Sequence, residues 1–66
     1  MKVGIIGCGF IGTEIAQFID ESETFQLIGL NDADKSKADE LIKKLKNNKL
    51  KFMDLDELIS KSDLII

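Results

Sequence analysis

The 66-residue chain contains no histidine, tyrosine, arginine or proline, and it has a single cysteine. Without histidine, tyrosine or arginine the sequence offers no recognisable acid–base or anion-stabilising catalytic set. Without histidine or a second cluster of ligands it also offers no metal site. One cysteine builds no disulfide framework, and a free thiol is typical of the reducing cytoplasm, where we expect this protein to be located.

The chain also lacks a large excess of either acidic or basic residues, and it has no long apolar segment. The 12 acidic residues face 9 basic ones, all lysine, for a net charge of −3. This balance excludes the basic surface that nucleic acids or anionic membranes attract. No apolar run approaches the ~20 residues of a membrane span, and the start lacks the apolar core of a signal peptide. We therefore expect no nucleic-acid partner and no membrane association.

The length is short for the pattern that the chain carries. A complete doubly wound α/β domain needs roughly 100–150 residues, and a chain of about 60 residues buries only about 60% of its unfolded surface. The final residues, 63–66, form an apolar run that predicts a buried strand. We therefore expect residues 1–66 to be the N-terminal part of a larger domain, with the remainder and a substrate domain lying outside this chain.

The first half alternates a strand, a helix and a strand. Lys2 to Ile6 is a continuous apolar run typical of a strand buried on both faces. A helix follows, with one apolar stripe that we expect in the core. The second predicted strand is Phe25 to Leu30, in which Gly29 indicates close backbone approach or a local weakness. The helical stripe consists of Ile11, Ile15, Ala16 and Ile19.

The second half continues the alternation. A helical stripe is predicted to start at a cap, Asp34 or Ser36, and to end at Asn47-Asn48. Leu50 and Phe52 alternate with lysines, which favours a strand at a sheet edge. Asp54 followed by Glu57 predicts a capping box before a short third helix. The stripe of the longer helix is Ala38, Leu41, Ile42 and Leu45.

The predicted order, including a last strand at residues 63–66, is β-α-β-α-β-α-β. Strands separated by helix-length segments pair in parallel through right-handed crossovers. We therefore predict the α/β class, with a doubly wound parallel sheet of Rossmann type. Only its first half is expected here, with the strands in the spatial order 3-2-1-4.

Gly7 to Gly12 match the pattern G-x-G-x-x-G. The pattern is weak alone, but here it follows a predicted strand and opens a predicted helix, as dinucleotide-binding loops do. Gly7 is expected to permit the turn, Gly9 to let a pyrophosphate approach, and Gly12 to let the helix pack closely on the strand. The free amides near Phe10 and Ile11 at the helix start would then face the phosphates.

Asp32 ends the second predicted strand, 20 residues after Gly12. An acid at this place binds the adenosine ribose hydroxyls and repels a 2′-phosphate. The alternative is a solvated turn or helix-capping aspartate, although Asp34 is the more natural cap. We expect NAD as cofactor, with NADP left open by Lys35 and Lys37. Cys8 is either a thiolate stabilised at a helix start or, as we favour, a small side chain in a crowded turn.

Three stretches, 1–12, 25–34 and 54–66, resemble the N-terminal part of L-aspartate dehydrogenases, which are relatives of homoserine dehydrogenase. The resemblance extends to glucose–fructose oxidoreductases, inositol dehydrogenases and dihydrodipicolinate reductases. It implies that the loop residues hold the pyrophosphate and that Asp32 holds the ribose. It also implies that residues outside this chain supply a catalytic histidine and a domain for substrate binding and dimerisation. A homo-oligomer that acts on a small amino acid is therefore expected. The family's loop often has alanine at the position of Phe10. The loop residues concerned are Gly7, Gly9, Phe10, Ile11 and Gly12.

Two functions compete at this stage. The first is the NAD(P)-binding part of an oxidoreductase that oxidises L-aspartate or a similar amino acid, and this part alone is expected to be inactive. Homoserine dehydrogenase or a glucose–fructose oxidoreductase type of enzyme is the alternative within that class. The second is a regulatory domain that senses a nucleotide without chemistry, as in potassium channels. In such regulatory domains the second strand usually follows the first helix after a shorter connection than in this sequence, which favours the enzyme.

Overall fold

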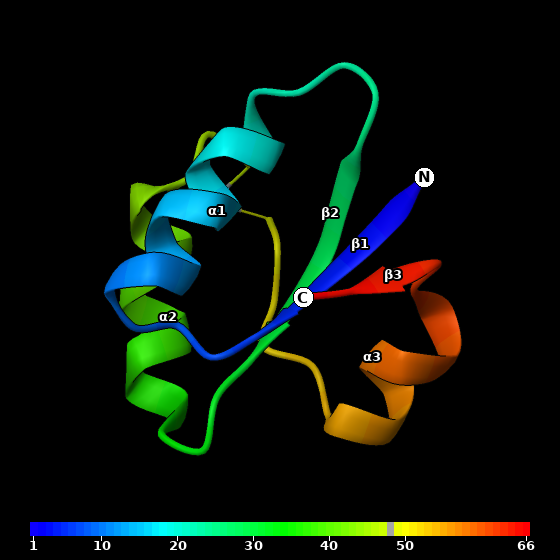
Figure 1. The fold of residues 1–66 in the computed structure, drawn as a ribbon. Coiled ribbons are helices and arrows are strands. Elements are labelled where there is room, and N and C mark those ends of the chain that lie inside the picture. Colours follow the sequence, from blue (N-terminus) through cyan, green and yellow to red (C-terminus); the bar gives the residue numbers. More distant parts are fainter. Residues whose placement is uncertain (48) are drawn as a thin grey trace.

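A computed structural model describes residues 1–47 and 49–66. The elements along the chain are β1 (Lys2–Ile6), α1 (Phe10–Asp20), β2 (Gln26–Asn31), α2 (Lys35–Lys44), α3 (Leu55–Lys61) and β3 (Leu64–Ile65). The three strands form one parallel sheet in the order β2-β1-β3. Helices α1 and α2 cover one face of the sheet, and α3 lies on the other (Figure 1). The predicted α/β class with a parallel sheet is therefore confirmed.

The predicted third strand is wrong, but the rest of the predicted order 3-2-1-4 is confirmed, because β3 is the predicted fourth strand and lies beside β1 on the side opposite β2. Only Phe52 pairs with the outer edge of β2, through a single parallel bridge to Leu30. The Met53 amide then donates to the Leu30 carbonyl at 2.9 Å, and the chain leaves toward α3. Because only Phe52 and Met53 reach the edge of β2, they form a single bridge and not a ladder of paired residues. The expected alternation of burial is nevertheless present, because Leu50 is buried while Lys49 and Lys51 are exposed.

The core lies mainly between the sheet and the α1–α2 layer. Its largest fully buried members on this side are Val3 and Ile5 of β1, Leu30 of β2 and Leu41 of α2. On β1 these side chains alternate toward the helices, as the pleat requires. Packing of this apolar stripe holds the two helices over the first two strands, so the carboxyl ends of β1 and β2 lie beside the starts of α1 and α2.

On the opposite face, small residues let α3 approach the sheet. A Cβ atom on Gly4 would lie 2.7 Å from the Leu58 side chain, and one on Gly29 would lie 3.0 Å from it. Leu58 is fully buried there. Close backbone approach, one of the two predicted explanations for Gly29, is therefore the one that the structure supports.

Two details of the helices differ from the prediction. Ile11 is 71% exposed, so the core side of α1 consists of Ala16 and Ile19 with Ile15 packed against it. Helix α2 ends at Lys44 and not at Asn47-Asn48, of which Asn48 lies outside the described residues. The cause is Asp20 at the end of α1. Its carboxylate accepts the Lys46 amide at 2.6 Å and draws the chain away from the helical path.

The third helix starts at the predicted place without the predicted capping box. Asp54 is the N-cap residue, but its side chain makes no capping hydrogen bond, and Glu57 instead pairs with Lys61 at 2.8 Å. Within the described residues, no helix is long and apolar enough to cross a membrane.

Candidate functional site

The glycine loop joins β1 to α1 at the carboxyl edge of the sheet. Gly7 has φ +98°, a backbone conformation that side chains with a Cβ rarely adopt. Its amide donates to the Asn31 carbonyl at 2.8 Å, which ties the loop to the end of β2. A Cβ atom on Gly12 would collide with the Gly7 carbonyl oxygen, so the helix packs on the turn only because residue 12 is glycine. The structural roles predicted for these two glycines are confirmed.

The start of α1 is open to an anion. Gly9 is the N-cap residue, and nothing lies within 4 Å of the position that a Cβ atom would take there. Among the described residues, no side chain caps this helix and none of its first-turn residues is acidic. An α-helix carries a partial positive charge and free amides at its start, which favour phosphate oxygens. By contrast, Asp34 caps α2 by accepting the Ser36 amide at 3.0 Å.

Asp32 lies directly against this loop. One carboxylate oxygen accepts the Cys8 amide at 2.7 Å, and the other accepts the Asp34 amide at 2.8 Å. These two bonds, the Cys8 amide first, lower the pKa of the Asp32 carboxyl below its usual value of 3.8, and the positive charge of Lys37 assists. The group is therefore an anion at neutral pH. A carboxylate has about four acceptor positions, so both oxygens can still accept ribose hydroxyls.

The sequence pattern assigned Asp32 to the same site as the glycine loop, but it did not predict the hydrogen bond that Asp32 accepts from the Cys8 amide. Cys8 and Asp32 are 24 positions apart in the chain, and no local sequence pattern predicts a hydrogen bond over that separation. The prediction that Asp34 is the cap of α2 is confirmed. Asp32 does share the capping turn, because it bonds the Asp34 amide, so the two alternatives considered for Asp32 are not exclusive.

Cys8 fills the turn and does not present a thiolate. Its side chain is buried, and its sulfur lies 3.6 Å from the Asn31 carbonyl oxygen. Burial raises the pKa of the Cys8 thiol above 9.0, and the nearby negative charge of Asp32 raises it further. The geometry therefore supports a small protonated side chain in a crowded turn over a reactive thiolate.

Asn31 is a residue of this site that the sequence analysis missed. Its carbonyl accepts the Gly7 amide, and its side-chain amide donates to the Met53 carbonyl at 2.8 Å. It thereby joins the glycine loop, the end of β2 and the segment before α3. Its only sequence signal is its position next to the strand-ending acid.

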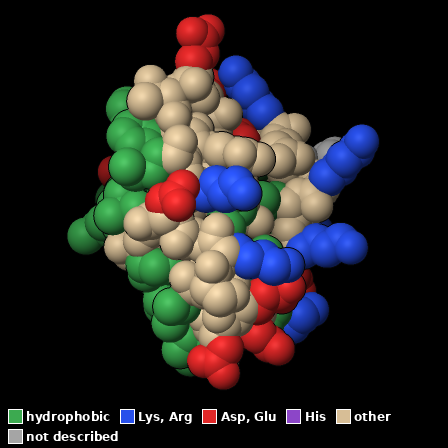
Figure 2. Space-filling view, turned by 90° about the vertical axis from the view of Figure 1, so that its right-hand side faces the viewer, with side chains coloured by type: hydrophobic (Ala, Val, Ile, Leu, Met, Phe, Trp, Pro, Cys, Tyr) green, Lys and Arg blue, Asp and Glu red, His purple; other side chains and the backbone are tan. Residues whose placement is uncertain are grey.

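Two hollows flank the exposed Phe10, whose side chain is 79% accessible. One, of about 480 Å³, is apolar and is lined by Ile6, Ile11, Ile15 and Ile66. The other, of about 290 Å³, lies between the loop and α2. Figure 2 shows hydrophobic side chains gathered along one edge of the molecule, with lysines and acids over the rest of the visible face. The second hollow is lined by Cys8, Gly9, Thr13, Lys37, Glu40 and Lys44, among others.

Comparison with known proteins gives a consistent result. A family model described as "Oxidoreductase family, NAD-binding Rossmann fold" matches residues 1–66. Proteins named L-aspartate dehydrogenase are similar along all of this chain: 46% identical in Methanosarcina mazei, 48% in Methanosarcina acetivorans and 39% in Methanosarcina barkeri. In each case the match covers 25% of the relative, so the chain spans about a quarter of their length. No solved structure matches significantly.

Proposed function

This chain belongs to the oxidoreductase family with an NAD-binding Rossmann fold, and on that basis we propose that its glycine loop and Asp32 hold the ADP half of NAD. Gly7, Gly9 and Gly12 shape the loop, while the amides of Phe10 and Ile11 donate to the pyrophosphate. The observation that carries the proposal is the Asp32 carboxylate, held 2.7 Å from the Cys8 amide beside an uncapped helix start. Ribose hydroxyls and a diphosphate are the groups that this arrangement complements.

The wider activity is that of an amino-acid dehydrogenase. The relatives are named L-aspartate dehydrogenases, so we propose that residues 1–66 serve as the N-terminal cofactor-binding part of such an enzyme, with aspartate or a similar amino acid as substrate. NAD accepts a hydride from the substrate when it is bound. Residues 1–66 contain no histidine, tyrosine or arginine to move the accompanying proton. We therefore propose that the catalytic group lies in a part of the enzyme outside residues 1–66. We also propose that the enzyme is a cytoplasmic homo-oligomer.

The loop residues perform binding and orientation only. Oriented amides at a helix start bind phosphate oxygens without rearrangement, so their interaction with a diphosphate loses little to reorganisation. Asp32 adds direction, because its carboxylate accepts hydroxyl protons from one side of the ribose. The same negative charge disfavours a 2′-phosphate, so we propose that NAD is preferred to NADP.

Titration of the ¹⁵N-labelled chain with NADH tests the proposal. We expect the largest amide shifts in residues 7–12 and 32, and we expect Asp32→Asn to weaken NADH binding about tenfold, because bonds to a charged acceptor are the stronger ones. The matched control is Asp39→Asn, an exposed acid on α2 that pairs with Lys35 at 3.4 Å. Saturable NADH shifts elsewhere, or equal affinities for the three proteins, would contradict the proposal.

A further inference from the structure

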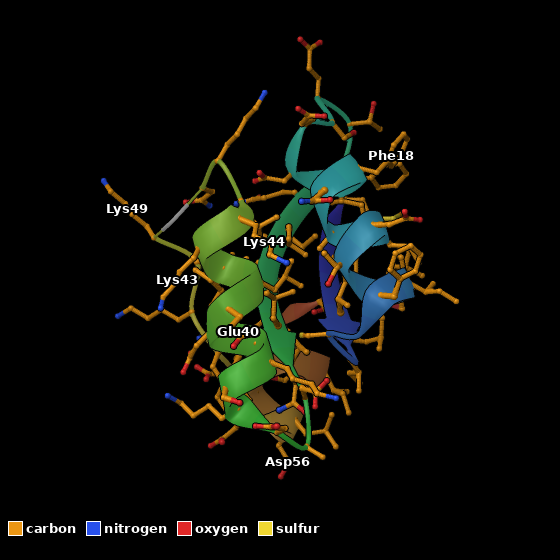
Figure 3. All side chains as sticks on the ribbon, turned by 90° about the vertical axis from the view of Figure 1, so that its left-hand side faces the viewer. Phe18, Glu40, Lys43, Lys44, Lys49 and Asp56 are labelled. Carbon is orange, nitrogen blue, oxygen red and sulfur yellow. The ribbon has the colours of Figure 1, made fainter. Side chains whose placement is uncertain are left out.

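The end of β2 lies at the outer edge of the sheet, where one short segment of the chain meets it. Phe52 makes a single parallel bridge to Leu30 there, and the Met53 amide donates to the Leu30 carbonyl at 2.9 Å. Figure 3 shows this segment passing along the flank of α2, from Lys49, which extends away from the fold, to Asp56 near the start of α3. The Met53 carbonyl is then the next acceptor along this edge.

A side chain donates to that carbonyl. In a parallel ladder, every second residue of a strand bonds the neighbouring strand on a given side through its amide and its carbonyl. If the bridge at Leu30 continued as such a ladder, the amide of Asp32 would donate to the Met53 carbonyl. The side-chain amide of Asn31 takes this place and donates to the Met53 carbonyl at 2.8 Å. The Asp32 backbone is therefore not needed at the edge of the sheet.

Asn31 is also held on its inner side, against β1. Its carbonyl accepts the Gly7 amide at 2.8 Å, in the register that pairs Ile6 with Asn31. The last residue of β2 is thus fixed between the glycine loop and the segment before α3. The next residue, Asp32, leaves the strand, and its carboxylate accepts the Cys8 amide at 2.7 Å. The position of that carboxylate therefore depends on where the end of β2 is held.

We propose that Asn31 is a positioning residue for dinucleotide binding, whose side chain holds the end of β2 so that the Asp32 carboxylate meets the glycine loop. The inference rests on the proposed function, because it takes Asp32 as the acid that binds the ribose. Without the Asn31 amide, the Met53 carbonyl loses a donor, and a partly buried acceptor without a donor is costly. The Asp32 amide is the backbone donor that a ladder would supply, so Asp32 is drawn toward the sheet edge and away from Cys8.

Asp20 provides a similar anchor near the other end of the connection between α2 and α3. Its carboxylate accepts the Lys46 amide at 2.6 Å, just after the end of α2. Loss of either anchor loosens this connection, but Asn31 is the one that adjoins the ribose-binding acid in the chain. The substitution Asp20→Ala therefore separates the loss of an anchor from the displacement of Asp32.

The test measures the NADH dissociation constant and the titration of the Asp32 carboxyl, followed by ¹³C NMR, in wild type, Asn31→Ala and Asp20→Ala. We expect Asn31→Ala to weaken NADH binding about fivefold, the equilibrium effect of one neutral hydrogen bond. The pKa of the Asp32 carboxyl should rise toward its usual value in this variant, because the bond from the Cys8 amide, which lowers it most, is loosened. Asp20→Ala should leave that pKa unchanged and NADH binding within about twofold.

A double-substitution cycle distinguishes positioning from a general loss of structure. If Asn31 acts through Asp32, Asn31→Ala should change NADH binding by less than about twofold in an Asp32→Ala background, because no carboxylate is left to position. Asn31→Thr repeats each comparison in case Asn31→Ala does not fold. Threonine suits a strand, and its hydroxyl is one bond shorter than the asparagine amide.

The outcomes separate this inference from the proposed function. If the wild-type chain does not bind NADH, the proposed function fails and this inference with it. If it binds NADH and the substitution of Asn31 changes neither the affinity nor the pKa of Asp32, the inference is overturned while the proposed function stands. An equal loss of affinity in Asp20→Ala, or an undiminished loss in the Asp32→Ala background, would also overturn it, since either result indicates a general structural role.

Discussion

Among single residues, Asp32 joins two segments of the site. Its two oxygens bond the amides of Cys8 and Asp34, so the acid joins the glycine loop to the first turn of α2 before any ligand binds. Both bonds favour the charged form, because an amide donates better to a carboxylate than to a protonated carboxyl group. The folded state therefore holds this group with a lower pKa than the unfolded chain does.

A pH dependence of stability follows from that shift. A lowered folded-state pKa adds stability that is fully present above the unfolded value, near 3.8, and is lost as the pH falls through the folded value. We expect the free energy of unfolding, measured by urea denaturation, to fall less between pH 7 and pH 3 in Asp32→Asn than in wild type. Asp39→Asn, whose acid has no such backbone bonds, is the control. Identical acid sensitivity of wild type and Asp32→Asn would contradict the assignment.

At the scale of elements, the helices α1, α2 and α3 begin in different ways. Helix α2 begins with a side-chain cap from Asp34, and α3 begins at Asp54 without a capping bond but with Asp56 and Glu57 in its first turn. Helix α1 has Gly9 as its N-cap residue, with no side-chain capping bond and no acid in its first turn. The helix that should meet the pyrophosphate is thus the one whose amides are left to a ligand, while the other two starts are compensated by their own acids.

The caps give a matched pair of substitutions. Asp34→Ala removes a bonded cap and should lower the free energy of unfolding by about 1 kcal/mol, the usual cost of losing an N-cap side chain. Asp54→Ala removes an N-cap residue whose side chain makes no such bond, so its effect should be smaller. Urea denaturation followed by circular dichroism at 222 nm measures both. A larger loss for Asp54→Ala would show that the capping geometry described here is wrong.

At the scale of the whole molecule, apolar surface remains uncovered on one side of the sheet. Ile11 and Phe18 of α1 are each 71% exposed, and Ile66 beside β3 is 43% exposed. Among the described strands, β3 pairs only with β1. An open edge next to apolar side chains is prone to pairing with another chain.

We therefore expect the 66-residue chain to self-associate through the β3 edge. Sedimentation velocity should show an average mass that rises with protein concentration, and Leu64→Lys should shift the distribution toward monomer because a charged edge resists pairing. Ile59→Lys is the control, since Ile59 is also exposed but lies on α3. A monodisperse wild-type monomer at high concentration would contradict this expectation.

The amino-acid sequence was enough to predict the α/β class, the parallel strands and the positions of the glycine loop and Asp32. Those features depend on local periods and on glycines that a turn requires, and both are visible in a window of a few residues. The sequence could not predict that Phe52 makes one bridge and not a strand, because the path of the folded chain sets how many residues reach the edge of the sheet. The fold likewise decides that the Asp20 carboxylate accepts the Lys46 amide where α2 ends, and that Ile11 faces outward. Contacts between residues distant in sequence fix these features, and no local pattern encodes them.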